Sequence, residues 1–170
     1  MGLLTALAIS IGGLGGLATY LFVGPMGGVG LQIWAAFVAW AAFYHSGGKT
    51  AALASNIPAH ILGAAIGWAA LLGTTNLAGA MGVPVAAGIC VAIGAAAIVL
   101  AANIGAFGSI PSTVYGFACV AAYALLANKL GHLLSVSIVD NPLINIVVSM
   151  AVGAVLGFVS EKIGGALAKS

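Results

Sequence analysis

Long apolar runs separated by short polar links dominate the pattern along this chain. A helix needs about 20 apolar residues to cross the hydrocarbon core of a bilayer, and six stretches approach that length: residues 3–23, 28–45, 50–73, 82–102, 108–128 and 143–163. Polar and apolar residues do not alternate with a period of two, which excludes the strands of a transmembrane barrel. The pattern predicts an all-α polytopic membrane protein whose six transmembrane helices form a single domain over residues 1–170.

Composition narrows the class of protein further. Apolar residues make up 63% of the chain and charged residues 4%, whereas about a quarter of a soluble domain is charged. A soluble enzyme and a disordered chain are therefore excluded. The net charge is +2 and there is no arginine, so no basic patch exists for nucleic acid. We expect the lipid bilayer to surround the chain, and residues 3–23 to be a retained span because no basic segment precedes them.

The few lysines predict an orientation. With the N-terminus in the cytoplasm, Lys49 falls in a cytoplasmic loop and Lys162 and Lys169 lie at a cytoplasmic C-terminus. Lys129 then lies on the other side, close in sequence to Asp140. Because loops rich in lysine stay in the cytoplasm, this distribution favours both termini inside.

Two segments of the chain resemble each other. Residues 55–63 (SNIPAHILG) line up with residues 108–116 (GSIPSTVYG), and each follows a span that opens near a proline. This similarity predicts two parallel repeat units. Residues 25–73 contain the second and third spans, and residues 84–128 contain the fourth and fifth. The alternative is chance similarity between two helices rich in glycine and alanine.

The repeated motif points to a pathway for solute. Proline frees a backbone carbonyl when it lies inside a helix, and such backbone is tolerated in a membrane where it is buried or lines water. Pro58 and Pro111 would open two kinked helix starts that face each other. Polar side chains beside them would line the path: Asn56, His60, Ser109, Ser112 and Thr113. The alternative places each proline in the first turn of its helix, with Ser or Asn as the N-cap.

Aromatic and glycine residues complete the candidate pathway. Phe107 and Tyr115 flank the second motif, and we expect them to narrow it as a gate, although both would also suit an interfacial belt. Gly63 and Gly116 would let the two helices pack closely. His60 would either contact solute or bond to a neighbouring helix.

Enzymatic chemistry and bound cofactors are not expected. Cys90 and Cys119 lie in apolar runs without the spacing of a disulfide or metal site, and the three histidines have no carboxylate beside them. Glu161, at the end of the last span, is the one carboxylate in a predicted span. We therefore predict no metal, no cofactor and no catalytic residue.

Residues 41–49 (AAFYHSGGK) form an aromatic run followed by Gly-Gly and Lys, and residues 110–118 (IPSTVYGFA) contain proline, threonine, an aromatic residue and glycine. In these two segments the chain resembles a family of small bacterial inner-membrane proteins, the domain of unknown function 1097 family. The resemblance implies the bacterial cytoplasmic membrane as location and carries no established activity. A looser likeness of architecture links the chain to urea and ammonia channels, many of which are trimers.

These features predict a channel or facilitator for a small uncharged polar solute, with urea or a short amide as the best candidate, in a homo-oligomer for which a trimer is favoured. The alternatives are a proton-linked secondary transporter of a small metabolite, with His60 as the proton site, and a non-transporting accessory membrane subunit.

Overall fold

The computed structural model describes residues 1–169, and every regular element among them is helical. The α-helices are α1 (Leu3–Val23), α2 (Ile33–His45), α3 (Lys49–Met81), α4 (Val83–Ala101), α5 (Ile110–Leu126) and α6 (Pro142–Lys169). Short 3-10 helices occupy the links, namely η1 (Gly27–Val29), η2 (Gly105–Phe107) and η3 (Leu130–His132). The all-α prediction is confirmed.

Four of the six α-helices are long and apolar enough to cross a membrane. By length and composition these are α1, α3, α4 and α6. α2 and α5 have 13 and 17 residues, fewer than the roughly 20 that span the hydrocarbon core. Four candidate spans are thus compatible with the predicted helical membrane protein, and the crossing of the bilayer by all six α-helices stays a prediction.

Three helix boundaries differ from the predicted spans by about five residues or more, and one of them is the end of α6, at Lys169 rather than at residue 163. α3 continues to Met81 rather than stopping at residue 73. Its polar side chains bond to their own helix: Thr74 Oγ1 donates to the Ala70 carbonyl at 2.8 Å, and Asn76 Nδ2 to the Leu72 carbonyl at 2.7 Å. α2 begins at Ile33 rather than at residue 28.

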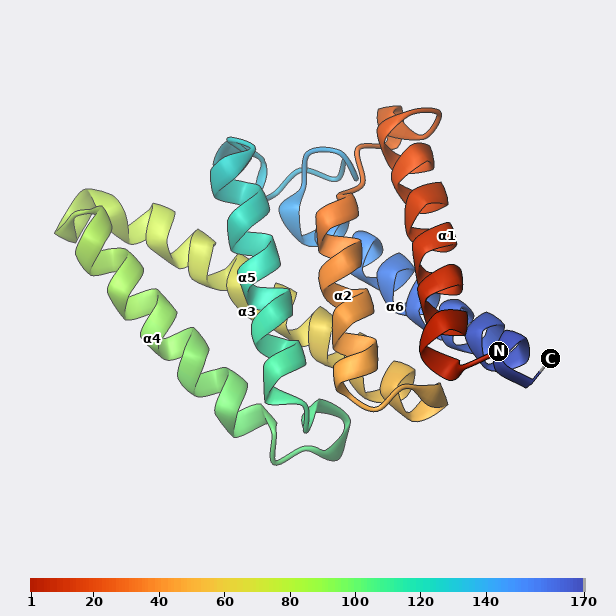
Figure 1. Cartoon of the computed structure of the whole chain (residues 1–170). Coiled ribbons are helices and arrows are strands. Elements are labelled where there is room, and N and C mark those ends of the chain that lie inside the picture. Colours follow the sequence, from red (N-terminus) through yellow and green to blue (C-terminus); the bar gives the residue numbers. More distant parts are fainter. Residues whose placement is uncertain (170) are drawn as a thin grey trace.

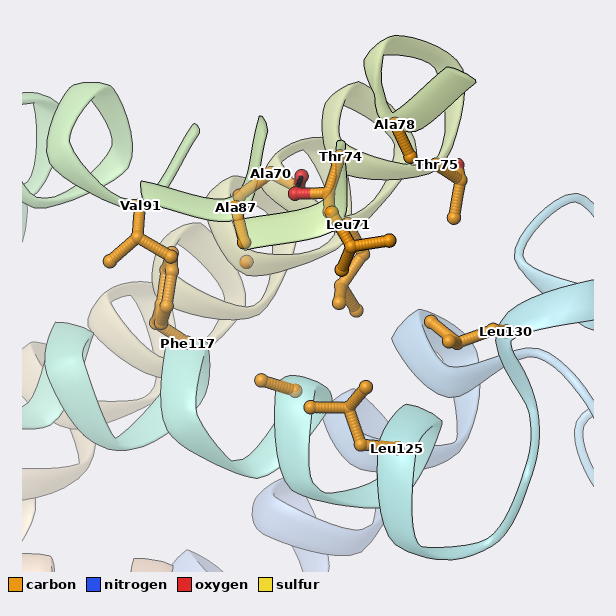
Figure 2. A pocket seen from close by; sticks show the side chains of 13 residues that line it. Ala70, Leu71, Thr74, Thr75, Ala78, Ala87, Val91, Phe117, Leu125 and Leu130 are labelled. Carbon is orange, nitrogen blue, oxygen red and sulfur yellow. Dashed lines mark hydrogen bonds between the residues drawn. The ribbon is translucent and has the colours of Figure 1, made fainter. Parts of the chain in front are cut away.

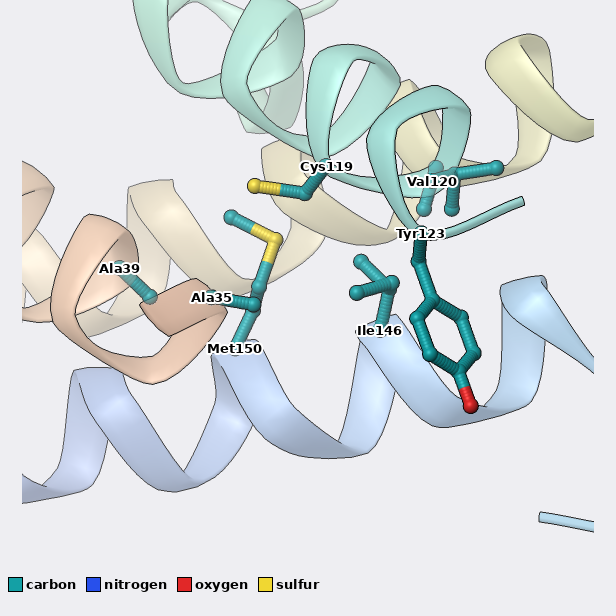
Figure 3. Packing of buried hydrophobic residues seen from close by; sticks show 8 residues of the cluster. Ala35, Ala39, Cys119, Val120, Tyr123, Ile146 and Met150 are labelled. Atoms are coloured by element: carbon teal, nitrogen blue, oxygen red, sulfur yellow. The ribbon is translucent and has the colours of Figure 1, made fainter. Parts of the chain in front are cut away.

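The two longest helices, α3 and α6, organise the bundle. They run obliquely and contact each other; α4 and α5 pack against α3, and α1 and α2 pack against α6 (Figure 1). A buried cluster forms where α2, α3, α5 and α6 meet (Figure 3), and it contains Ala35, Ala39, Ala64, Cys119, Val120, Tyr123, Ile146 and Met150. Because lipid tails are as apolar as these side chains, close packing rather than the hydrophobic effect holds the helices together.

Glycines set the closest approaches of the helices. A side chain on Gly153 of α6 would overlap the carbonyl oxygen of Ala36 of α2, and a Cβ on Gly157 would lie 2.9 Å from Cβ of Phe43. Nothing lies within 4 Å of such an atom on Gly12 or Gly16 of α1. Gly153 and Gly157 of α6 therefore pack within the chain, whereas Gly12 and Gly16 of α1 face outward.

The lysines separate into two groups, at opposite ends of the bundle. Lys49, Lys162 and Lys169 border one surface hollow together with Glu161, beside the start of α3 and the end of α6. Lys129 follows the end of α5, and its Nζ lies 2.7 Å from Oδ1 of Asp140. This is the grouping on which the predicted orientation depends.

Candidate solute site at the crossing of α3 and α5

α3 and α5 approach each other through two glycines. A side chain on Gly63 would overlap the carbonyl oxygen of Thr113, and one on Gly116 would overlap the carbonyl oxygen of His60. The contact is reciprocal, because a Cβ on Gly63 would lie 3.0 Å from the backbone nitrogen of Phe117 and one on Gly116 2.9 Å from that of Ala64. The two segments singled out by their similarity thus lie against each other.

Polar side chains of the two segments form one hydrogen-bonded cluster at this crossing. Asn56 Oδ1 accepts from Ser112 Oγ at 2.8 Å and from Ser46 Oγ at 2.9 Å. Ser109 Oγ donates to Ser112 Oγ at 2.8 Å, and Thr113 Oγ1 donates to the Ser109 carbonyl at 3.1 Å. Asn56, Ser112 and Thr113 are almost completely buried. Four of the predicted pathway residues are therefore neighbours in space.

Three buried polar atoms beside this cluster have no hydrogen-bond partner among the described residues. They are Nδ2 of Asn56 and both ring nitrogens of His60. The exposed fraction of Asn56 is 0% and that of His60 is 2%. Leaving a buried polar group unpaired costs about 1–3 kcal/mol, so such groups need a further explanation such as a bound water or ligand.

The two prolines have different places in their helices. Pro58 lies inside α3, nine residues after its first residue, Lys49, so the interpretation of Pro58 as a helix start is wrong. Pro111 lies in the first turn of α5. Ser109, the N-cap residue of α5, makes no side-chain bond to the backbone of that turn, because its hydroxyl instead donates to Ser112. The chain accommodates Pro58 within α3, close to the cluster around Asn56.

The predicted gate residues are only partly buried. Tyr115 packs against the central apolar cluster, and Phe107 belongs to η2, which contacts α3. Their role as a gate stays a prediction.

Two residues at the crossing were missed by sequence reasoning. Ser46 bonds to Asn56 from the link between α2 and α3, and Phe117 follows Gly116 and lies against Gly63, Gly67 and Gly94. Ser46 precedes Gly47 and Gly48, whose φ values of 87° and 69° turn the chain back toward α3. That Gly-Gly pair was the available signal for a loop that returns close to the bundle.

The cluster offers neutral donors and acceptors and no charged group. No set of three His, Cys, Asp or Glu that could hold a metal ion occurs within residues 1–169. Cys90 and Cys119 are free thiols. His45 and His132 are exposed, away from the unpaired atoms. Such a site can exchange hydrogen bonds with a small polar molecule but contains no activated nucleophile of the usual kind.

Comparison with known proteins gives one match. A family model described as protein of unknown function DUF1097 matches residues 8–165. No curated protein and no solved structure matches the chain. The match covers nearly the whole helical bundle, including both segments at the α3–α5 crossing, and it agrees with the resemblance carried by residues 41–49 and 110–118. The chain therefore belongs to the DUF1097 family.

Proposed function

We propose that this protein is a channel or facilitator for a small uncharged polar solute, with urea or a short amide as the best candidate. The observation that carries the proposal is the set of unpaired buried atoms at the α3–α5 crossing. Asn56 Nδ2 is a donor, and a neutral imidazole supplies one donor and one acceptor. An amide or urea carries both kinds of group, so it can satisfy both residues at once.

The proposed pathway follows the α3–α5 crossing. Asn56 and His60 bind the solute, and Ser109, Ser112 and Thr113 hold Asn56 in place and line the path. Pro58 and Pro111 shape the backbone there, Phe107 and Tyr115 narrow the path, and all six α-helices cross the bilayer. No catalytic step is part of the proposal.

The proposed setting is the bacterial cytoplasmic membrane, with both termini in the cytoplasm. The three lysines at one end of the bundle support this orientation. The outward-facing Gly12 and Gly16 of α1 provide a surface on which copies of the chain could pack as a homo-oligomer, a trimer being the favoured form.

A stopped-flow shrink–swell assay on proteoliposomes tests the proposal. Urea, acetamide, glycerol, ammonia and water are compared, and we expect one of them to cross far faster than in empty liposomes. Asn56→Leu should lower that flux about tenfold, the loss expected from one hydrogen bond of about 1.4 kcal/mol in the transition state. Asn76→Leu is the matched control, because Asn76 lies on the same helix and is exposed. Wild-type flux equal to that of empty liposomes for every solute contradicts the proposal.

His60 supports a second candidate, a proton-linked transporter of a small metabolite. An imidazole inside a membrane helix is a functional candidate by default, and it titrates in the range of pH 5–8 when unperturbed. A proton gradient should then drive uptake, and His60→Leu should abolish that coupling. Flux that does not respond to the proton gradient would contradict this second candidate and leave the passive facilitator. A stable protein partner together with no flux would instead indicate an accessory subunit.

A further inference from the structure

The arrangement of the six α-helices contains a correspondence between its two halves. α3 packs against α4 and α5, and α6 packs in the same way against α1 and α2, while α3 and α6 contact each other. Rotating Figure 1 by half a turn in the plane of the page brings α4, α5 and α6 approximately to the places of α1, α2 and α3. Corresponding helices run in opposite directions, as in an inverted-topology repeat.

The sequences of α3 and α6 support this correspondence. Residues 63–68 (GAAIGW) match residues 153–158 (GAVLGF), with both glycines in register. The first glycine of each segment also makes a corresponding contact: a side chain on Gly63 would overlap the Thr113 carbonyl of α5, and one on Gly153 the Ala36 carbonyl of α2. In the same alignment Ser160 of α6 corresponds to Ala70 of α3.

The remaining helices align in the same way. Gln32 and Ser109 are the N-cap residues of α2 and α5. When these two residues are aligned, Trp40 corresponds to Phe117 and Tyr44 corresponds to Ala121. Aligning the first residues of α1 and α4 pairs Ala6 with Ala86, both 0% exposed.

We infer that α1–α3 and α4–α6 are inverted copies of one three-helix unit, joined at Gly82. We also infer that, of the two corresponding crossings, the α3–α5 crossing is the one left open for solute. The second part of this inference rests on the proposed function.

The two copies differ in how their crossings are tied together. At the α2–α6 crossing, Trp40 Nε1 donates to Ser160 Oγ at 3.0 Å and the Tyr44 hydroxyl lies 2.8 Å from the same oxygen. Trp40 and Ser160 are buried. Trp40 and Tyr44 of α2 thereby both contact one serine of α6.

The corresponding place in the other copy is a cavity. It has a volume of about 540 Å³ and is lined mainly by apolar side chains of α3, α4 and α5, together with Thr74 and Thr75 of α3 and Leu130 of η3 (Figure 2). Its lining includes Ala70, Phe117 and Ala121, the three counterparts of Ser160, Trp40 and Tyr44. Ala70 and Ala121 stand where the other copy has the Ser160 hydroxyl and the Tyr44 ring, and the Phe117 ring lacks the indole N–H of Trp40. Among the described residues no side-chain hydrogen bond joins α5 to α3 on this side of the glycine contact, so α5 has room to move beside the cavity. Asn56 and His60 lie on the other side of that contact and do not line the cavity.

The division at Gly82 differs from the parallel units 25–73 and 84–128. That earlier alignment extends over nine residues on α3 and α5, whereas the inverted alignment includes all six α-helices and their contacts. The two divisions make different predictions for Ala70 and Ala121, because only the inverted repeat places them opposite Ser160 and Tyr44.

Introducing the counterparts of Ser160, Trp40 and Tyr44 on α3 and α5 tests the inference. The full chain carrying Ala70→Ser, Phe117→Trp and Ala121→Tyr is compared with the three single variants in detergent and in proteoliposomes. We expect Tm of the triple variant to rise by at least about 2 °C and by more than the sum of the single changes, because the new hydroxyl and rings bond to one another. A triple variant whose Tm change equals or falls below that sum, or which fails to fold, overturns the repeat.

The reverse variant gives an independent measurement. Ser160→Ala, Trp40→Phe and Tyr44→Ala together should lower Tm by less than the sum of the single losses, because Ser160→Ala alone removes the partner of both aromatic side chains. Additive losses would show that the contacts with Ser160 do not act together, and would remove the basis for rebuilding them in the other copy. For the wild-type solute, the rebuilt triple variant should show flux at least about tenfold lower. Unchanged flux in a stabilised triple variant overturns the role of α5 movement but keeps the repeat. Absent flux in the wild type counts against the proposed function and leaves the Tm test unaffected.

Discussion

The α3–α5 and α2–α6 crossings are built alike but treat their polar groups differently. In each, a glycine of the long helix faces a backbone carbonyl of the short one. At the α2–α6 crossing, Asn145 Nδ2 donates to the carbonyls of Gly30 and Ile138, both at 2.9 Å, and Ser149 Oγ accepts from the backbone N–H of Gln32 at 2.9 Å. At the α3–α5 crossing, Asn56 Nδ2 and both His60 nitrogens are unpaired.

This difference separates a scaffold from a candidate site. Asn145 and Ser149 satisfy backbone groups of the links before α2 and α6, so they fix those links to the bundle. Asn56 and His60 are equally buried and serve no such backbone group. The same helix geometry therefore acts as a structural junction in one half and leaves hydrogen-bonding capacity for a ligand in the other.

The largest expected effect comes from adding a methyl group at either crossing. Gly63→Ala and Gly153→Ala would each place Cβ on a backbone oxygen, and the helices must separate, at a cost of about 3 kcal/mol. Gly13→Ala on α1 is the control, because no atom lies within 4 Å of its added Cβ and alanine favours a helix. Thermal unfolding in detergent measures the difference. Equal Tm values for Gly13→Ala and Gly63→Ala would contradict the close packing at α3–α5.

Exchanging the two buried asparagines for leucine sharpens the comparison. Asn145→Leu leaves two carbonyls without their donor and should lower stability by about 1–3 kcal/mol. Asn56→Leu removes the acceptor of two serines but also an unpaired amide, so it should lower stability less while reducing flux more. Tm and solute flux are measured on both variants. A larger stability loss for Asn56→Leu than for Asn145→Leu would reverse the assignment of scaffold and site.

Replacing the prolines should give a smaller effect, and an unequal one. Pro58→Ala restores a backbone donor inside α3 next to the cluster, so it should straighten this part of α3 and change flux severalfold. Pro111 is exposed in the first turn of α5, where a missing N–H costs little, so Pro111→Ala should leave flux nearly unchanged. Flux through both single variants is compared, with membrane insertion as the control. Equal effects would restore the idea of two equivalent proline motifs.

The sequence predicted more of the fold than of the site's detail. The apolar runs located all six α-helices, since burial in lipid demands long apolar segments with internally bonded backbone. The apolar runs predicted the end of α3 too early, because the polar residues Thr74 and Asn76 can form hydrogen bonds with their own helix. Asn56, His60, Ser109, Ser112 and Thr113 were recognised as polar residues within spans. That Asn56 Nδ2 and His60 are unpaired, whereas Asn145 is paired, depends on tertiary contacts with loops that hydropathy does not encode.

The smallest expected effect lies outside the membrane helices, at the ion pair between Lys129 and Asp140. The hydrogen bond from Lys129 lowers the pKa of the Asp140 carboxyl below its ordinary 3.8, with a further contribution from Ser137. The same bond raises the pKa of Lys129 above 10.5. A lowered carboxyl pKa adds stability that is present above the unfolded value and is lost as pH falls through the folded value. Both groups are solvent-accessible, so the gain is small and is screened by salt.

Asp140→Asn tests this pair against both crossings. At neutral pH the variant should have a Tm slightly below that of the wild type, by less than any change at Gly63 or Asn145. The difference should shrink as pH falls through the lowered pKa of the Asp140 carboxyl, where the wild-type side chain is also protonated, and should shrink at high salt. A Tm difference as large as that of Asn145→Leu would show that the link between α5 and α6, rather than the α2–α6 crossing, carries the larger share of the scaffold's stability.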